Sequence, residues 1–206
     1  MLDIENLSLR DLYIILLRYY NRPVERARLL WSIEDEEVES LDKYVKYLDD
    51  PRIRLSIIER LLLLGLSIDK IVEAIDWRAF ESLVSEFFRS YGYKTYRNYR
   101  LKRNEYDVIA VKQDITLSID CKHWDKPLPP SKAREVAENL RLRSRKLYGD
   151  PLFKGNRIYM AIITMRESRV SFIDGVAVIP ITYLRNFIEE LYSLIYQGYM
   201  KEASEP

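Results

Sequence analysis

The sequence predicts a mixed α/β fold preceded by a separate, all-helical segment. Up to about residue 75, apolar side chains recur only at helical spacing. From Trp77 onward the pattern changes to one helix, three strand candidates, a second helix, two more strand candidates and a last helix. Residues 157–164 form a nearly continuous apolar run, as expected of a strand buried on both faces. This order predicts a mixed sheet flanked by helices.

The N-terminal segment, residues 1–75, predicts a small helical bundle. Its expected helices begin near Ser8, Val24, Glu34, Pro51 and Ser67. A serine is a common N-cap and a proline suits the first helical turn, so these starts have a physical basis. Pro23 separates the first two helices, and Gly65 ends the fourth.

Residues 76–206 predict the α/β domain. The expected elements are helices over 77–91, 131–148 and 182–197 and strands over 93–99, 105–112, 115–122, 157–164 and 175–179. The first helix is amphipathic, with apolar residues at i, i+3, i+4, i+7 and i+8 from Phe80, and Gly92 closes it. The strand over 115–122 alternates, so Asp120 and Lys122 share one face about 7 Å apart along the strand.

The net charge of +1 conceals an uneven distribution along the chain. Residues 1–88 carry 12 basic and 18 acidic side chains, residues 89–157 carry 17 and 8, and residues 158–206 carry 4 and 6. A basic middle segment between acidic flanks predicts a nucleic-acid surface. The acidic N-terminal bundle argues against a DNA-binding helix-turn-helix there and favours a dimerisation or protein-docking module.

Cysteine content and hydropathy narrow the class of protein. Cys121 is the only cysteine, which excludes an internal disulfide and a cysteine-based zinc cage. The aliphatic runs at residues 14–17 and 61–64 are too short to cross a bilayer, and no signal peptide is visible. We therefore expect a soluble cytoplasmic protein. Only 6 glycines beside abundant Glu, Arg and Tyr is a weak sign of heat adaptation.

Two carboxylates and a lysine are expected to meet at one end of the sheet. Asp107 lies in an otherwise apolar strand, where a carboxylate is costly unless a cation or hydrogen-bond donors satisfy it. Asp120 and Lys122 project from the neighbouring strand. Such oxygen ligands suit Mg²⁺ or Mn²⁺, whose remaining positions are filled by water and substrate phosphate.

This pattern resembles the PD-(D/E)xK nuclease signature. The run Tyr106-Asp107-Val108-Ile109-Ala110-Val111-Lys112, followed by Leu117-Ser118-Ile119-Asp120-Cys121-Lys122, is similar to the catalytic strands of archaeal Holliday junction resolvases and Mrr-like restriction endonucleases. The preceding helix, with Phe80-Glu81 and then Gly92-Tyr93, resembles their opening helix. The resemblance covers roughly residues 77–165 and implies a restriction-endonuclease-like core over residues 76–206.

The resemblance implies a metal-dependent DNA endonuclease and assigns a role to each matching residue. Asp107 and Asp120 would hold Mg²⁺ or Mn²⁺, with the backbone carbonyl of Cys121 as a third ligand. Glu81 would approach from the helix, directly or through a water. Lys122 would orient or help deprotonate the attacking water and offset phosphate charge. The implied substrates include branched or structured DNA in repair, recombination or restriction.

The sequence departs from the signature in three places. Tyr106 stands where the signature has proline, and Asp120 replaces the commoner glutamate, a change that the signature allows. The resolvases carry a serine in the loop before the first metal aspartate, and residues 99–104 contain none. This last departure bears on junction specificity more than on phosphodiester chemistry.

Basic residues interleaved with tyrosines predict the DNA contacts. The candidates are Arg97, Arg100, Lys102 and Arg103 in one strip, Arg141 and Arg145 on the helix after the motif, and Trp124 next to it. Trp124 would stack on a base or sugar, with core packing as the alternative. For the helix, the alternative is an ordinary solvated basic face.

Simpler interpretations exist for the other site candidates. Asp120 and Lys122 alone would be an ion pair on a solvated strand, which contributes little to stability. Glu86 competes with Glu81 but lies off its helix face, so we interpret it as a surface residue. His123, the only histidine, has the wrong strand parity and is expected to be structural. Cys121 is expected in the core.

Two function classes remain open besides the DNA endonuclease. One is a catalytically silent DNA-binding subunit that retains the nuclease fold, and the other is a nuclease acting on RNA or single strands. The intact set of acids favours activity, because a protein that only binds phosphates has no need of clustered carboxylates. DNA is the expected partner. A homodimer is plausible because paired cuts need paired sites, and the helical bundle is a candidate docking site for another protein.

Overall fold

The computed structural model describes residues 6–123 and 128–203. The chain divides into two compact units, Met1–Ala79 and Phe80–Pro206. The division falls inside helix α6 (Trp77–Ser90), three residues from its start. None of the described helices is both long and apolar enough to cross a membrane.

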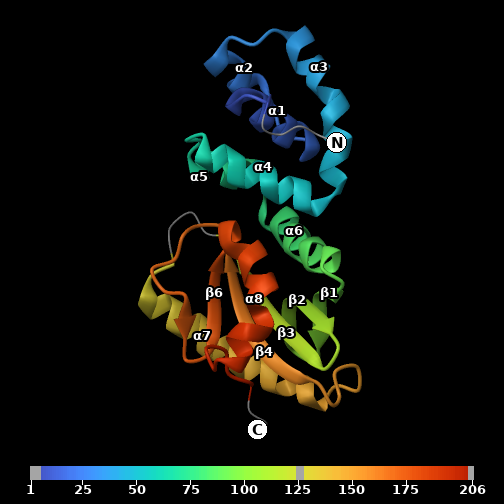
Figure 1. Cartoon of the computed structure of the whole chain (residues 1–206), viewed down its shortest axis with the longest axis vertical. Coiled ribbons are helices and arrows are strands. Elements are labelled where there is room, and N and C mark those ends of the chain that lie inside the picture. The colour runs from blue at the N-terminus through green and yellow to red at the C-terminus, as the bar shows by residue number, and fades with distance from the viewer. Residues whose placement is uncertain (1–5, 124–127, 204–206) are drawn as a thin grey trace. The chain divides into compact units, whose positions relative to one another are not determined.

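The elements described in the first unit before α6 are all helical, as the sequence predicts (Figure 1). They are α1 (Leu9–Tyr19), α2 (Glu25–Trp31), α3 (Asp35–Val45), a 3₁₀ turn (Lys46–Asp49), α4 (Pro51–Leu63) and α5 (Ile68–Ala74). Ser8 caps α1 in a capping box, in which the Asp11 N–H donates to Ser8 Oγ at 3.3 Å and the Ser8 N–H donates to Asp11 Oδ2 at 3.1 Å. Ser67 occupies the N-cap of α5, but its side chain makes no capping bond.

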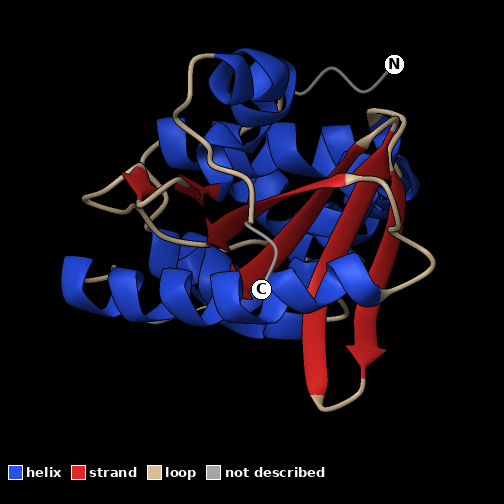
Figure 2. Ribbon diagram, turned by 90° about the horizontal axis from the view of Figure 1, so that it is seen from below, coloured by secondary structure: helices blue, strands red, loops and turns tan. Residues whose placement is uncertain are grey.

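The second unit is built on a six-stranded mixed sheet of order β1-β2-β3-β4-β6-β5. The strands are β1 (Lys94–Leu101), β2 (Asn104–Lys112), β3 (Ile115–Lys122), β4 (Arg157–Thr164), β5 (Phe172–Ile173) and β6 (Val176–Pro180). The pairs β1–β2, β2–β3 and β5–β6 are antiparallel, whereas β3–β4 and β4–β6 are parallel. Helices lie on both faces of the sheet (Figure 2). The predicted mixed α/β fold is therefore confirmed.

Helix α7 (Pro130–Ser144) connects β3 to β4 and packs against the sheet, whereas α8 (Leu184–Tyr196) follows β6. Parallel neighbours such as β3 and β4 need a crossover of this kind. The apolar residues of α7, including Val136 and Leu140, share a core with Met160 and Ile162 of β4. This packing fixes the last turn of α7 near β2, which matters for the site described below.

The polar face of β3 is buried, which the alternating pattern did not predict. Thr116 and Ser118 are fully buried and Asp120 is 3% exposed. Asn156 Nδ2 donates to Thr116 Oγ1 at 2.8 Å, so part of this face is satisfied by a side chain 40 residues away. A strand in the middle of a sheet with helices on both sides has no solvated face, whatever its alternation.

Several elements differ from the prediction, most by one or two residues. The two-residue strand β5 is absent from it, because so short a run has no periodicity of its own. Strand β1 continues to Leu101, since its pairing with β2 extends to the hairpin turn. Helix α7 ends at Ser144 and is followed by a 3₁₀ turn over Arg145–Gly149.

Candidate functional site

Strands β2 and β3 part where the two predicted aspartates lie. The last registered pair at this end is Val108 with Ile119, and Asp107 and Asp120 lie one residue beyond it. Residues opposite each other on antiparallel strands project to the same side, so these two carboxylates are neighbours. The Cys121 N–H donates to Asp107 Oδ2 at 2.7 Å. The Asp107 side chain thus accepts a backbone hydrogen bond at the point where the pairing of β2 with β3 ends.

Strand β1 is irregular beside this point. Asn98 has a φ of 49° and lies between the registered pairs that Arg97 and Tyr99 make with β2, opposite Asp107. Asparagine tolerates the left-handed region better than most residues. On either side of it, Tyr96 and Tyr99 both pack their rings on Phe153, at 5.8 and 5.4 Å between centroids.

Asp120 is a buried carboxylate held by two cations. Its Oδ2 atom lies 2.5 Å from Lys122 Nζ, and its Oδ1 atom lies 2.5 Å from Arg143 Nη2. The Asp120 side chain is 4% exposed, whereas those of Lys122 and Arg143 are 23% and 28% exposed. The alternative of an ion pair on a solvated strand is therefore wrong.

Arg143 reaches this site from the last turn of α7. Its Nη1 donates to the Glu105 carbonyl at 2.9 Å, and its own carbonyl accepts the Tyr106 hydroxyl at 2.7 Å. Arg143 is not among the DNA contacts predicted from the sequence. Its contact with Asp120 spans 23 positions, so no local spacing could have revealed it.

Burial and neighbouring charge perturb Asp107. Desolvation raises its pKa above the ordinary value, and the negative charge of Asp120 raises it further. The Cys121 N–H and the positive charges of Lys122 and Arg143 act in the opposite direction without cancelling the rise. The structure thus brings three of the predicted site residues, Asp107, Asp120 and Lys122, into one electrostatic environment.

Glu81 lies on α6 and is 8% exposed. Its charge, together with those of Asp107 and Asp120, adds to desolvation in raising the pKa of the Cys121 thiol. Cys121 is therefore within electrostatic range of all three predicted acids. It is half-buried rather than fully in the core as expected. The competing residue Glu86 accepts a hydrogen bond from Ser82 Oγ at 2.6 Å, one turn away on the same helix.

The donors at this site fit a hard divalent cation in type. Asp107, Asp120 and the Cys121 carbonyl supply only oxygen, as Mg²⁺ and Mn²⁺ prefer. Over residues 6–123 and 128–203, however, no three His, Cys, Asp or Glu side chains are grouped as metal ligands. Both carboxylate oxygens of Asp120 are instead in ion pairs.

The candidate DNA contacts fall into two groups. Arg97, Arg100, Lys102 and Arg103 are exposed on β1 and the β1–β2 turn. Arg100 forms an ion pair with Glu105 at 3.0 Å. In the second group, Arg141 donates a hydrogen bond to the Asp174 carbonyl, and Arg145 is half-buried in the turn after α7. Trp124 lies outside the described residues.

His123, which is predicted to be structural, lies near an aromatic side chain of α6. Its ring is 6.1 Å from that of Phe80 on α6. This aromatic contact agrees with a structural role.

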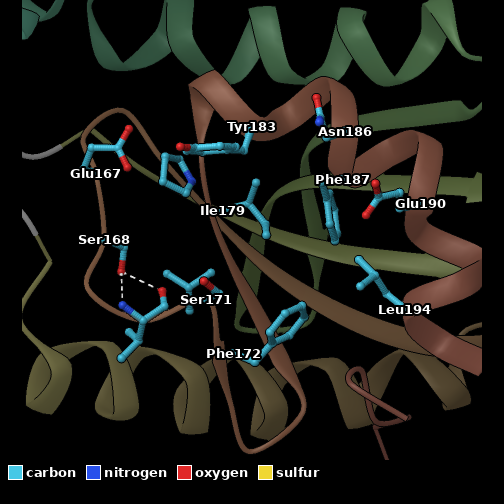
Figure 3. A pocket seen from close by; sticks show the side chains of 13 residues that line it. Glu167, Ser168, Ser171, Phe172, Ile179, Tyr183, Asn186, Phe187, Glu190 and Leu194 are labelled. Carbon is cyan, nitrogen blue, oxygen red and sulfur yellow. Dashed lines mark hydrogen bonds between the residues drawn. The ribbon is translucent and has the colours of Figure 1, made fainter. Parts of the chain in front are cut away.

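A separate pocket of about 450 Å³ lies between β6, α8 and the segment that leads into β5 (Figure 3). Tyr183, Phe187 and Glu190 line it, and Ser168 bonds the backbone of Val170 at its edge. None of the predicted site residues lines this pocket. Its aromatic and acidic lining does not suit a nucleic-acid phosphate.

Comparison with known proteins identifies one family. Residues 72–146 match the family of Mrr catalytic domains, described as a restriction endonuclease. The matched segment runs from within α5 into the 3₁₀ turn after α7, so it contains Asp107, Asp120 and the last turn of α7. No curated protein and no solved structure matches the chain.

Proposed function

We propose that this protein is a divalent-metal-dependent endodeoxyribonuclease, because its residues 72–146 match a restriction endonuclease domain of the Mrr type. The reaction would be hydrolysis of phosphodiester bonds in DNA. The observation that carries the proposal is the pair of neighbouring carboxylates, Asp107 and Asp120, with Lys122 beside them where β2 and β3 part. Burying charges in this way is costly, and such clusters occur at functional sites more often than chance.

The proposed ligands of Mg²⁺ or Mn²⁺ are the carboxylates of Asp107 and Asp120 and the carbonyl of Cys121. Glu81 would act from α6, directly or through a water. A bound divalent cation would lower the pKa of water and stabilise the negative charge that develops on the phosphate.

Lys122 would hold the attacking water and balance the charge of the scissile phosphate. Its ammonium nitrogen lies 2.5 Å from Asp120 Oδ2, and the Lys122 side chain is 23% exposed, so the lysine is both positioned and partly accessible. A lysine is suited to this role because it is a compact charge with three donors.

DNA is the proposed substrate, with contacts from Arg97, Arg100, Lys102 and Arg103 on β1 and its turn and from Arg141 and Arg145 near the end of α7. These basic groups would bind phosphates, so they give affinity without choosing a base sequence. Branched or structured DNA in repair, recombination or restriction is the proposed context. A homodimer, and a docking role for the N-terminal helices, belong to the same proposal.

A second candidate is a catalytically silent DNA-binding subunit. One observation favours it: Asp120 is balanced by Lys122 and Arg143, so the site is satisfied without a metal ion. The two candidates differ in metal affinity and in cleavage, which makes them separable.

The deciding experiment is a cleavage assay with Mg²⁺ or Mn²⁺ on supercoiled, linear, flapped, four-way-junction and single-stranded DNA, with an RNA arm. Wild type would be compared with Asp120→Ala and Lys122→Ala, and Arg157→Gln would serve as the control, since it breaks an exposed pair with Asp114. Cutting that both site variants lose while DNA binding remains supports the endonuclease. Intact binding with no cutting of any substrate would establish the silent subunit instead.

A further inference from the structure

We propose that Arg143 is an internal counter-ion of Asp120 that competes with the divalent cation for this carboxylate. In the metal-free protein the guanidinium group would occupy the carboxylate edge that a cation needs. The inference rests on the proposed function, because it takes Asp120 to be a metal ligand.

The contact that carries the inference is the one between Arg143 Nη2 and Asp120 Oδ1, at 2.5 Å. Lys122 takes the other oxygen of the same carboxylate at an equal distance. Asp120 is 3% exposed, so little water is available to replace either partner. A cation that binds Asp120 must therefore share or displace at least one of these two groups.

Arg143 is held in this position by strand β2. Its Nη1 donates to the Glu105 carbonyl, and Tyr106, which is 1% exposed, donates its hydroxyl to the Arg143 carbonyl. Glu105 and Tyr106 directly precede Asp107 in the chain. Tyr106 also stands where the nuclease signature has a proline, which has no hydroxyl to donate. The departure from the signature and the placement of Arg143 are thus linked by one hydrogen bond.

The contact between Arg143 and Asp120 is expected to weaken metal binding because of its charge. Asp120, which lies beside Asp107, is paired with two cations, Lys122 and Arg143, so its negative charge is balanced without a metal ion. A divalent cation between the same carboxylates would lie close to the guanidinium group and be repelled by it. The guanidinium group of an arginine keeps its proton in proteins, so it cannot relieve this repulsion by losing its charge. Removal of the guanidinium charge should therefore increase metal affinity.

Binding of Mg²⁺ and Mn²⁺ without DNA tests the inference by calorimetry, with thermal unfolding in the presence and absence of metal as a second readout. Arg143→Gln is expected to bind metal roughly tenfold more tightly than wild type and to gain more thermal stability from it. Arg143→Lys keeps the charge and should remain close to wild type. Tyr106→Phe keeps the ring but loses the hydrogen bond to the Arg143 carbonyl. Its metal affinity should therefore fall between that of wild type and that of Arg143→Gln. Arg157→Gln, which removes an arginine–aspartate pair elsewhere, should match wild type.

The possible results separate this inference from the proposed function. If wild type binds metal and Arg143→Gln binds it equally or more weakly, the counter-ion role is overturned and the metal-dependent nuclease stands. If neither protein binds metal in the absence of DNA, the counter-ion role is overturned, and the cleavage assay with Mg²⁺ or Mn²⁺ then decides the proposed function by itself. Circular dichroism establishes whether Arg143→Gln is folded, and if it is not, unchanged metal affinity of Tyr106→Phe overturns the inference.

Discussion

Asp107 and Asp120 are neighbours across β2 and β3, yet their carboxylates are balanced in different ways. Asp107 accepts a backbone N–H from Cys121 at 2.7 Å, whereas Asp120 is paired with Lys122 and Arg143 at 2.5 Å each. Burial and the charge of Asp120 raise the pKa of Asp107. Removal of the negative charge should therefore have opposite effects on stability at the two positions.

Asp107→Asn should stabilise the metal-free protein at neutral pH. Because the folded pKa of Asp107 lies above its ordinary value of 3.8, folding favours the protonated form. The stability that this group contributes is present below pH 3.8 and is lost as the pH rises through the folded pKa. Thermal unfolding from pH 3 to 8 checks this. The melting temperatures of wild type and variant should converge in acid and separate above it, and a lower value for the variant at pH 7 would contradict the prediction.

Asp120→Asn should destabilise the protein, because Lys122 and Arg143 lose their shared counter-charge. Removing one partner of a buried ion pair costs about 3–5 kcal/mol. The lower end is expected here, since the side chains of Lys122 and Arg143 are 23% and 28% exposed. Urea unfolding measures the change, and Asp114→Asn, which breaks the exposed pair with Arg157, is the control with an expected loss of about 1 kcal/mol or less.

Glu81→Gln should reduce cleavage by about 10- to 100-fold if Glu81 supports the metal ligands from α6. Glu86→Gln is the matched control, because Glu86 lies on the same helix and is bonded to Ser82. Rates with saturating DNA and titrated Mg²⁺ would separate a loss of metal affinity from a loss of turnover. Equal effects of the two substitutions would show that the position of Glu81 is not special.

The double variant Lys102→Gln/Arg103→Gln should bind DNA more weakly than wild type. The loss should be the same for all base sequences and smaller at high salt. These two exposed cations lie in the β1–β2 turn. The slope of log K against log salt is negative, and each lost phosphate contact makes it less steep by about 0.9. The slope of the double variant should therefore be less steep by about 2. Fluorescence anisotropy at several salt concentrations measures it. An unchanged slope would remove this turn from the DNA contact surface.

Ser8→Ala should cost about 1 kcal/mol of stability, since Ser8 forms a capping box with Asp11 at the start of α1. Ser67→Ala is the control at an equivalent position, because Ser67 makes no capping bond at the start of α5. Denaturant unfolding of the two variants compares them directly. A loss at Ser67 as large as that at Ser8 would contradict the prediction.

The fold class and most elements were predictable because they depend on local periodicity. The strands over 115–122 and 157–164 have the bounds that the sequence predicts, and the helices of residues 6–76 begin within a few residues of their capping and proline signals. Side chains two apart on a strand share a face, so Asp120 and Lys122 were predictably close. The roles assigned to Glu81, Asp107, Asp120 and Lys122 in catalysis stay predictions.

The way in which the charges of Asp120 and Lys122 are balanced depends on elements far away in the sequence. The burial of β3 on both faces depends on the helices that cover the sheet, and alternation within the strand carries no information about them. Arg143 reaches Asp120 because α7 crosses from β3 to β4 and ends beside Glu105 and Tyr106. Local spacing of two residues in a strand and 3.6 in a helix sets which residues share a strand face or one side of a helix. The contact between Arg143 and Asp120, 23 positions apart, depends on packing, because the apolar core determines where α7 ends.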